Sequence, residues 1–457
     1  MTERMVPRWT GSGLRELRVV IWSAPPAAIL TVGFCLFLLY AFPGFMSSDS
    51  VLQISEARTA MFSNAHPPIM AAEWRVLECF VAGPILMLVV QGAVFLAGLH
   101  AILGRVLAPR RAAVAAVALL LFPPILTTMA VIWKDSQMAA YLLAGTAALL
   151  GPRLRIRLIG LALLSAACAF RYNAAAAVLP LVGLLFVWRP GQRWWQRYAI
   201  AAAAFVATVV VAFRVNSLLT VERKFLSPAF NDIVGVLYYE ADRSDDDLRH
   251  LLRGTPLRVT TGIHARVRKL YWARTSWQVT RGDARLFDDA VTPEQVAALS
   301  RAWRELVLGD PGAYLAHRTG VFEELLGLSE LPLWSPVYTG FVESAEQGQW
   351  IEHNAARSRI QSLVVPELET LATDTSLFRP YLYAALALAL LVLCCRDRLT
   401  LALLTSGLVY ELGYFPTVST PDVRYSHWMV TCTCAAALLL FVQRYRAGRR
   451  PARGAVA

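Results

Sequence analysis

Residues 79–100 read CFVAGPILMLVVQGAVFLAGLH and contain no Asp, Glu, Lys or Arg. A helix of about 20 consecutive apolar residues is long enough to cross a bilayer. Comparable apolar segments recur at 24–42, 112–132, 136–151, 158–170, 174–188, 198–219, 377–395, 399–416 and 427–443. This repetition predicts an all-α polytopic membrane protein with about ten transmembrane helices.

The composition of the 457 residues agrees with a membrane protein, because 56% are hydrophobic and only 17% are charged. Soluble domains carry about 25% charged residues. Disordered chains, collagen-like chains and small disulfide scaffolds are excluded by the same values. The net charge is +12. Only three of the cations are lysines, and many of the arginines flank apolar segments, which is typical of topology signals and not of nucleic-acid binding.

The distribution of arginine sets the expected orientation. With a cytoplasmic N-terminus, twenty arginines fall on the inner side, and the short outer connections carry only five cations. This asymmetry favours a multi-pass protein of the bacterial inner membrane with both termini in the cytoplasm. The first apolar segment lacks an A-x-A cleavage site, so we interpret it as a retained helix.

One point in this topology stays open at the sequence level. Arg171-Tyr172-Asn173 separates the apolar segments 158–170 and 174–188. These residues form either an outer turn between two helices or a polar break in one bent helix. The arginine asymmetry favours two helices, because merging them would invert the orientation of every later segment.

Three regions follow from this pattern. Residues 1–219 form an N-terminal membrane region of seven helices, with a first outer loop at 43–78 that we expect to be catalytic. Residues 220–376 form a periplasmic domain, expected to be mainly helical because Thr292-Pro293-Glu294-Gln295 and Asp310-Pro311 are typical helix starts. Residues 377–457 supply three helices and a basic cytoplasmic tail.

Charged residues gather at the outer ends of the predicted helices, in four separate connections. They are Asp49, His66, Lys134, Asp135, Arg171, Asp422 and Arg424. An enzyme acting on a lipid headgroup needs such a ring of charges facing an interfacial cavity. The alternative is that helix ends are simply where charged residues are stable.

The first outer loop carries two candidate catalytic residues. Asp49 could accept a proton from a sugar hydroxyl and so raise its nucleophilicity, or it could belong to a helix N-cap formed by Ser47, Ser48 or Asp49. His66 precedes Pro67 and Pro68, which hold it extended. It could donate to a phosphate or serve as a structural turn residue.

The other connections supply candidate phosphate ligands. Lys134 could bind a lipid phosphate, with Asp135 orienting it or helping to hold a divalent cation. The alternative is a local salt pair with Asp135 as an N-cap. Arg171 and Arg424 could each bind a phosphate oxygen pair, supported by the neighbouring Asn173 and Tyr425.

The order of these motifs resembles the GT-C superfamily of integral-membrane glycosyltransferases. A span is followed by an outer segment with Asp49, then His66-Pro67-Pro68, the WKD turn at 133–135, Arg171-x-Asn173, an outer domain and Arg424-Tyr425. More narrowly, the chain is similar to the bacterial protein O-mannosyltransferase and aminoarabinose-transferase type. The resemblance covers residues 20–220 and 377–443.

This resemblance implies transfer of a sugar from a polyprenyl-phosphate donor to a glycan, lipid or protein acceptor. Asp49 would be the base, His66 the family's histidine, and Lys134, Arg171 and Arg424 the donor-phosphate ligands. Many members have a second acid directly after the first, whereas Ser50 follows Asp49 here. Metal dependence therefore stays open. No cofactor is implied with certainty, and a divalent cation at Asp49 and Asp135 is one possibility.

Two other classes of function compete with this interpretation. A transporter or lipid flippase would place ionisable groups near the bilayer midplane. Arg214 and Glu411 are the only charges well inside predicted spans, and both lie nearer an outer end. A non-catalytic subunit of an envelope assembly pathway would tolerate single replacements of the charged residues.

Overall fold

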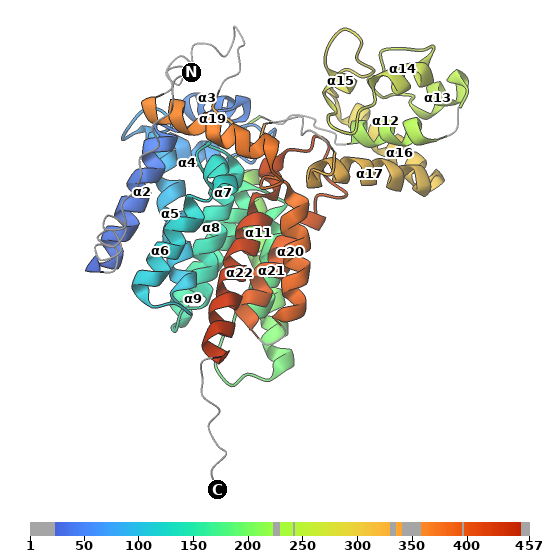
Figure 1. Ribbon diagram of the computed structural model, residues 1–457. Helices are drawn as coiled ribbons and strands as arrows, with labels where there is room; N and C mark the ends of the chain where they lie inside the picture. Colours follow the sequence, from blue (N-terminus) through green and yellow to red (C-terminus); the bar gives the residue numbers. More distant parts are fainter. Residues whose placement is uncertain are drawn as a thin grey trace.

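The computed structural model describes residues 23–222, 229–240, 243–329, 335–340, 358–394 and 397–448. Within these ranges the chain is all-helical, as expected, and its β-bridges are three isolated pairs. A long bundle carries a smaller helical unit beside one of its ends (Figure 1). Each of the two has its own buried apolar core.

The bundle helices are α2 (Pro26–Ala41), α5 (Ile85–Leu103), α6 (Pro109–Leu120), α7 (Pro123–Met129), α8 (Lys134–Leu149), α9 (Leu154–Phe170), α10 (Ala174–Leu185), α11 (Trp194–Leu219), α20 (Pro380–Leu393), α21 (Arg398–Leu412) and α22 (His427–Gly448). Each of the ten apolar segments in the sequence overlaps at least one of them. The segment 112–132 overlaps two, because the chain bends by 72° between α6 and α7. Pro123 and Pro124 begin α7, and a proline ring clashes with the preceding helical turn.

The membrane prediction is supported by some of these helices. In the described part of the chain, three helical stretches are long and apolar enough to cross a membrane, namely α5, α11 and residues 423–446, and the bent α6–α7 pair makes a fourth if it forms one span. The larger number of ten spans stays a prediction. Helices α9 and α10 are separate, with the break at residues 171–173, which answers the question that the sequence left open.

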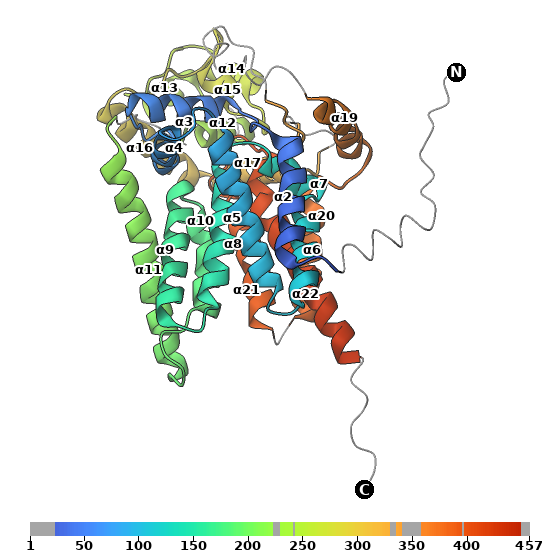
Figure 2. The ribbon, with the colours of Figure 1, turned by 90° about the vertical axis from the view of Figure 1, so that its left-hand side faces the viewer.

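Three short helices cover one end of the bundle, which we call the capped end. They are α3 (Ser48–Thr59), α4 (Ile69–Glu78) and α19 (Arg359–Asp374), and α3 lies across the bundle axis (Figures 1 and 2). Helix α2 begins and α22 ends at the opposite, open end. The connections α5–α6, α8–α9 and α10–α11 also lie at the open end (Figure 2).

Local chemistry fixes the start of α3. Ser47 is the N-cap, and its backbone N–H donates to Ser50 Oγ at 3.0 Å in a reciprocal capping box. Ser50 Oγ in turn donates to the carbonyl oxygen of Ile132 at 2.7 Å. A parallel bridge between Phe45 and Val131 continues this contact. The first connection is therefore bound to the α7–α8 connection along its length.

The smaller unit, called the outer unit here, consists of α12 (Ala229–Tyr239), α13 (Asp245–Leu251), α14 (Ile263–Leu270), α15 (Trp277–Thr280), α16 (Pro293–Gly309) and α17 (Pro311–Leu326). The two predicted helix starts are confirmed, with Thr292 and Asp310 as N-caps. Helix α19 does not belong to this unit. Its Val365 and Leu368 are buried in the bundle core, and its Gln361 donates to the Tyr40 and Phe42 carbonyl oxygens.

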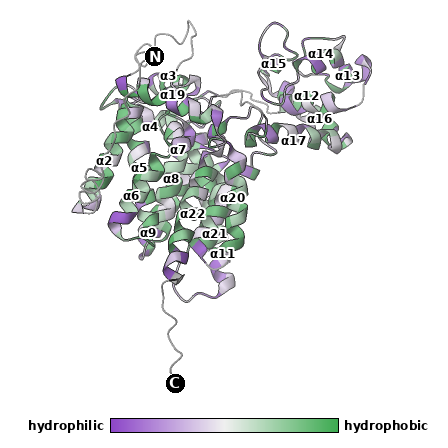
Figure 3. Cartoon of the chain, viewed as in Figure 1, coloured by the Kyte–Doolittle hydropathy of each residue, from purple (hydrophilic) through white to green (hydrophobic). Residues whose placement is uncertain are grey.

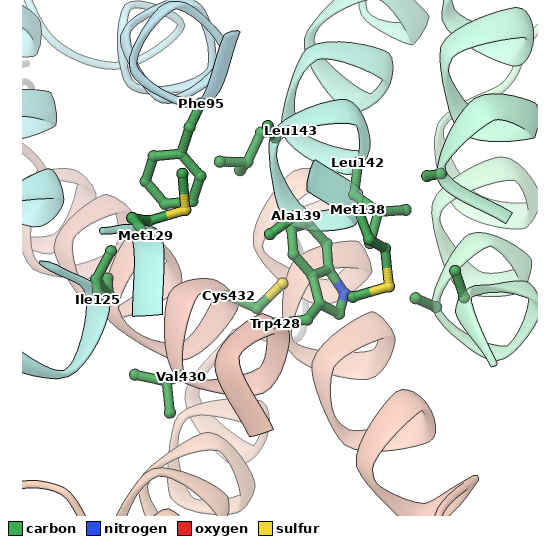
Figure 4. Close-up of a cluster of buried hydrophobic side chains, with 14 of the residues drawn as sticks. Phe95, Ile125, Met129, Met138, Ala139, Leu142, Leu143, Trp428, Val430 and Cys432 are labelled. Atoms are coloured by element: carbon green, nitrogen blue, oxygen red, sulfur yellow. The ribbon is translucent and has the colours of Figure 1, made fainter. Parts of the chain in front are cut away.

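The bundle core consists of fully buried apolar side chains where α5, α7, α8 and α22 meet. Phe95, Met129, Met138 and Trp428 from these four helices gather there (Figure 4). At Gly98 an added Cβ would lie 2.8 Å from the Ala144 backbone nitrogen, so a small residue sets the distance between α5 and α8. The bundle is mostly hydrophobic and the outer unit more polar (Figure 3).

A glycine is required inside the outer unit. A Cβ at Gly235 on α12 would lie 2.1 Å from His317 Nδ1 on α17. His317 is fixed from both sides, because Nδ1 pairs with the Tyr271 hydroxyl at 3.0 Å and Nε2 lies 3.3 Å from Asp232 Oδ1. The imidazole therefore cannot move away without breaking these contacts.

We expect Gly235→Ala to lower the free energy of unfolding of the outer unit by about 1–3 kcal/mol, because the added methyl group overpacks the site. Gly309→Ala at the end of α16 is the matched control, since its Cβ would meet nothing within 4 Å. The control should stay within about 0.5 kcal/mol of the parent. Proteolysis rates of the outer unit in urea measure both, and equal rates would contradict the packing argument.

Candidate functional site

Charged side chains from four connections meet at the capped end of the bundle. We call them the rim cluster, and its members are Asp49, His66, Lys134, Asp135, Arg171, Asp422 and Arg424. The first connection contributes from the start of α3 and from the loop before α4. The other three contribute from the start of α8, the α9–α10 break and the loop between α21 and α22. Contacts join them into two chains that meet at one aromatic ring.

Arg424 is the centre of the first chain. Its Nη2 donates to Asp49 Oδ2 at 2.9 Å, and its Nε lies 2.9 Å from Asp422 Oδ2. The guanidinium carbon lies 4.7 Å from the centre of the Trp133 ring and 5.3 Å from that of Tyr425. Two carboxylates and two aromatic faces therefore fix the orientation of one arginine.

His66 extends this chain to Lys134. Lys134 Nζ lies 2.6 Å from His66 Nδ1, and His66 Nε2 lies 3.8 Å from Asp49 Oδ1. An ammonium group can only donate, so we infer that Nδ1 accepts and that the imidazole proton is on Nε2, facing Asp49. Both Lys134 and Arg424 therefore place positive charge toward the same carboxylate.

Arg171 is the centre of the second chain. Its Nη1 donates to Asp135 Oδ2 at 3.0 Å, and its Nε donates to the Tyr414 hydroxyl at 2.8 Å. Tyr414 stacks on Tyr425 with an interplanar angle of 8°. The Arg171 guanidinium carbon lies 4.4 Å from the Tyr425 ring centre. Since Arg424 also lies against Tyr425, this ring joins the two chains.

The backbone around the cluster is positioned by neutral hydrogen bonds. Trp133 Nε1 donates at 2.8 Å to the Oγ of Ser47, the N-cap of α3. The Tyr338 ring packs on Trp133, and its hydroxyl donates to the Met46 carbonyl oxygen at 3.3 Å. The starts of α3 and α8, which carry Asp49 and Lys134, are thereby held next to each other.

The members of the cluster differ in exposure. The side chains of Asp49 and His66 are 26% and 19% exposed, whereas the Asp135 side chain is fully buried. Asp49 and His66 therefore lie on the more accessible side of the cluster, and the Asp135–Arg171 pair is more deeply buried.

The charges around Asp49 determine its protonation. Burial alone would raise the pKa of Asp49, but the positive charges of Arg424 and Lys134 hold it well below its usual range. Burial and the positive charge of Lys134 lower the pKa of His66 to about 3, so the ring is neutral at physiological pH. Burial raises the pKa of Asp422, and Arg424 opposes this effect.

The structure brings together most of the residues that the sequence indicated. Asp49, His66, Lys134, Arg171, Arg424, Asp135 and Tyr425 all belong to the two chains of contacts. Asn173 does not, because its side-chain amide donates to Thr417 at 3.4 Å on the exposed side of the break. Asp135 contacts Arg171 and is the fixed partner of that residue, whereas the sequence suggested that it orients Lys134.

Sequence reasoning missed four contributors to the cluster. Asp422 was counted at the outer ends but was given no role, although it shares Arg424 with Asp49. Trp133 is indicated by the sequence only as part of the WKD turn, and no signal points to Tyr414 or Tyr338. The spacing Asp422-x-Arg424 was the one available clue, since Asp422 also caps the short helix 423–426 by accepting from the Arg424 backbone N–H at 3.1 Å.

A divalent cation was one possibility at Asp49 and Asp135. Among the described residues, no three His, Cys, Asp or Glu side chains are grouped closely enough to hold a metal ion. Asp49 is bound to Arg424 and Asp135 to Arg171. A guanidinium thus already binds one oxygen of each carboxylate.

Comparison with known proteins gives no further assignment. The chain matches no family model, no curated protein and no solved structure. The function must therefore be argued from the chemistry of the rim cluster.

The buried ion pair generates a stability prediction. Asp135→Asn should destabilise the bundle by about 3–5 kcal/mol, because Arg171 keeps its charge in a site shielded from water. Asp246→Asn is the matched control, since that carboxylate is 85% exposed in a surface pair with Arg249, and it should cost below about 1 kcal/mol. Unfolding by SDS in mixed micelles measures both. Equal midpoints for the two variants would contradict the proposed support of Arg171.

Proposed function

We propose that the chain is a membrane glycosyltransferase that moves a sugar from a polyprenyl-phosphate donor to a hydroxyl acceptor on the outer face of the inner membrane. One observation carries this proposal. An accessible carboxylate, Asp49, pairs with Arg424 and lies beside His66, which contacts Lys134, at a site that the Trp133 and Tyr425 rings also line. The order of motifs that resembles the GT-C superfamily supports it independently.

The donor phosphate binds Lys134 and Arg424 in this proposal. Arg424 contacts Asp49 and Lys134 contacts His66, and both of these contacted side chains are partly exposed. A guanidinium and an ammonium are the usual protein ligands of phosphate. Arg171 supports the site from behind through the shared Tyr425 ring. The lipid chain of the donor lies along the apolar bundle helices.

Asp49 takes the proton of the acceptor hydroxyl while that oxygen attacks the anomeric carbon. The bond between the anomeric carbon and the phosphate oxygen breaks, and its electron pair leaves with the polyprenyl phosphate. One displacement of this kind inverts the anomeric configuration. Lys134 and Arg424 stabilise the charge that develops on the leaving phosphate, so no general acid is required.

Donor binding also makes Asp49 a better base. In the free cluster Arg424 and Lys134 hold the pKa of Asp49 down, and a carboxylate in that state is a weak proton acceptor. A phosphate that pairs with the same two cations neutralises them and raises the pKa of Asp49. The base is thereby activated when the donor is present.

Asp422 is the second candidate for the base, because it contacts the same arginine and its pKa is shifted in the opposite direction. Two carboxylates whose environments separate their pKa values are typical of acid–base sites. Asp422 also takes the place of the second acid that Ser50 fails to supply after Asp49.

The first test is the loss of the Asp49 carboxylate. Asp49→Asn should lower sugar transfer from a polyprenyl-phosphate donor in vesicles by about 10²–10⁴-fold, since a positioned base contributes this much. Asp374→Asn at the end of α19 is the matched control and should retain full activity. Wild-type turnover by normally expressed Asp49→Asn would reject the base assignment.

The pH dependence of kcat/KM, which reports the free enzyme, separates the two carboxylates. A base must be deprotonated, and the pKa of Asp49 is depressed, so with Asp49 as base kcat/KM stays level as the pH falls to about 4. With Asp422 as base the rate falls at a pH above the ordinary carboxyl value, and Asp422→Asn abolishes this limb. A limb above pH 4 that survives in Asp422→Asn would exclude both assignments.

The membrane orientation forms part of the proposal. All ten helical segments cross the membrane, the capped end faces outward, and both termini are cytoplasmic. A fluorescent protein fused after Gly191, between α10 and α11, should fluoresce, and alkaline phosphatase fused after Gly282, in the outer unit, should be active. The reverse pattern would place the rim cluster in the cytoplasm and contradict the use of an external acceptor.

A further inference from the structure

A second site lies where the outer unit meets the bundle. It is a cavity of about 410 Å³, lined by Asp232 of α12, Ser300, Trp303 and Arg304 of α16, Arg318 of α17, and Thr417 of the loop after α21. Small-molecule sites typically occupy 300–1,000 Å³ and combine aromatic walls with a few fixed polar groups. None of the residues of the rim cluster lines this cavity.

The polar wall of the cavity is rigid. Asp232 is buried and accepts from Trp303 Nε1 at 2.7 Å. It also pairs with His317, at 3.3 Å, and with Arg318. Burial lowers the pKa of His317, so Arg318 alone balances the charge of Asp232. The cavity thus presents a fixed carboxylate and guanidinium without a large excess of either charge.

These residues fit one class of ligand. A sugar ring has an apolar face of C–H groups, which packs on an aromatic side chain, and an edge of hydroxyls, which both donate and accept. Trp303 offers the aromatic surface, and Arg304 and Arg318 donate. Asp232 accepts, as do the hydroxyls of Ser300 and Thr417, whose protons are donated to the Val296 and Gly413 carbonyl oxygens. The charges of Asp232 and Arg318 balance, and Arg304 adds a single positive charge to the wall, so the lining fits a ligand rich in hydroxyls without demanding an anionic one.

The loop at residues 413–422 joins this cavity to the rim cluster. Its Thr417 lines the cavity, while its Tyr414 accepts a hydrogen bond from Arg171. Arg318 of the outer unit donates to the Val418 carbonyl oxygen at 2.7 Å, and Ser276 contacts Thr420. The same loop continues into Asp422 and Arg424. A ligand in the cavity therefore rests on the segment that carries the candidate phosphate ligand.

We propose that this cavity binds a saccharide unit of the acceptor, held by Trp303 and Asp232 while its reacting hydroxyl extends toward the rim cluster. The identification as an acceptor site rests on the glycosyl transfer proposed above. The binding of a saccharide rests only on the cavity.

Saturation-transfer NMR tests this binding on the full-length protein in nanodiscs, which avoids detergents with sugar headgroups. The probes are methyl α-mannopyranoside, methyl α-glucopyranoside and N-acetylglucosamine. At least one probe should receive saturation on its ring protons from the parent protein. Trp303→Ala should weaken binding about tenfold or more, as removal of an aromatic anchor commonly does. Trp277→Ala, at a tryptophan that is 61% exposed outside the cavity, is the matched control.

A filling variant guards against a merely structural effect of Trp303→Ala. Ser300 is exposed on α16 at the cavity edge, so Ser300→Trp fills the space without removing a framework contact, and it should also abolish the signal. The proposal is overturned if no probe binds the parent, or if Trp303→Ala and Ser300→Trp bind as well as Trp277→Ala.

The variant Asp49→Asn distinguishes this inference from the proposed function. It should bind the probe normally, because Asp49 lies outside the cavity. Binding without any sugar transfer in the vesicle assay would support the saccharide site and reject the glycosyltransferase. Transfer by a parent protein that binds none of the probes would reject the saccharide site and leave the proposed function standing.

Discussion

The ion pair between Asp49 and Arg424 joins residues 375 positions apart, and the arrangement of the capped end depends on it. Asp49 belongs to the first connection of the chain and Arg424 to the last. The electrostatic attraction within this pair is stronger at a partly buried, aromatic-lined site than it would be in water, because Trp133 and Tyr425 cover the guanidinium. The pair holds the first and last connections of the bundle together, next to Lys134 and Arg171.

The loop at residues 413–422 extends this constraint beyond the bundle. It contacts Arg171 through Tyr414 and the outer unit through Val418 and Thr420. The outer unit has its own core, and Val321 and Leu325 of its helix α17 are also buried in the bundle core. Its polar contacts with the loop at residues 413–422 connect the second site to the rim cluster.

The sequence predicted the elements well and the partners poorly. Apolar segments and caps such as Thr292 and Asp310 are local signals, so the helices of both parts could be identified. The gathering of these charges at one end of the bundle could be expected, because successive helices alternate in direction and every second connection therefore lies at the same end. Which carboxylate pairs with which arginine depends on the lateral order of the helices, and the sequence does not encode that locally. Asp135 was therefore given the wrong neighbour, Asp422 was given no role, and α19 was grouped with the outer unit.

Charge balance explains how such a cluster can act on a charged lipid. Three cations, Lys134, Arg171 and Arg424, face three carboxylates, Asp49, Asp135 and Asp422, and His66 is neutral. A cluster without net charge cannot bind a phosphate by long-range attraction, so the phosphate has to replace a carboxylate at one of the cations. Asp135 is buried with Arg171 and Asp422 is less exposed than Asp49, so in the proposed mechanism Asp49 is the carboxylate that the phosphate displaces. In that mechanism the displaced Asp49 then takes the proton of the acceptor, which links donor binding to activation of the acceptor.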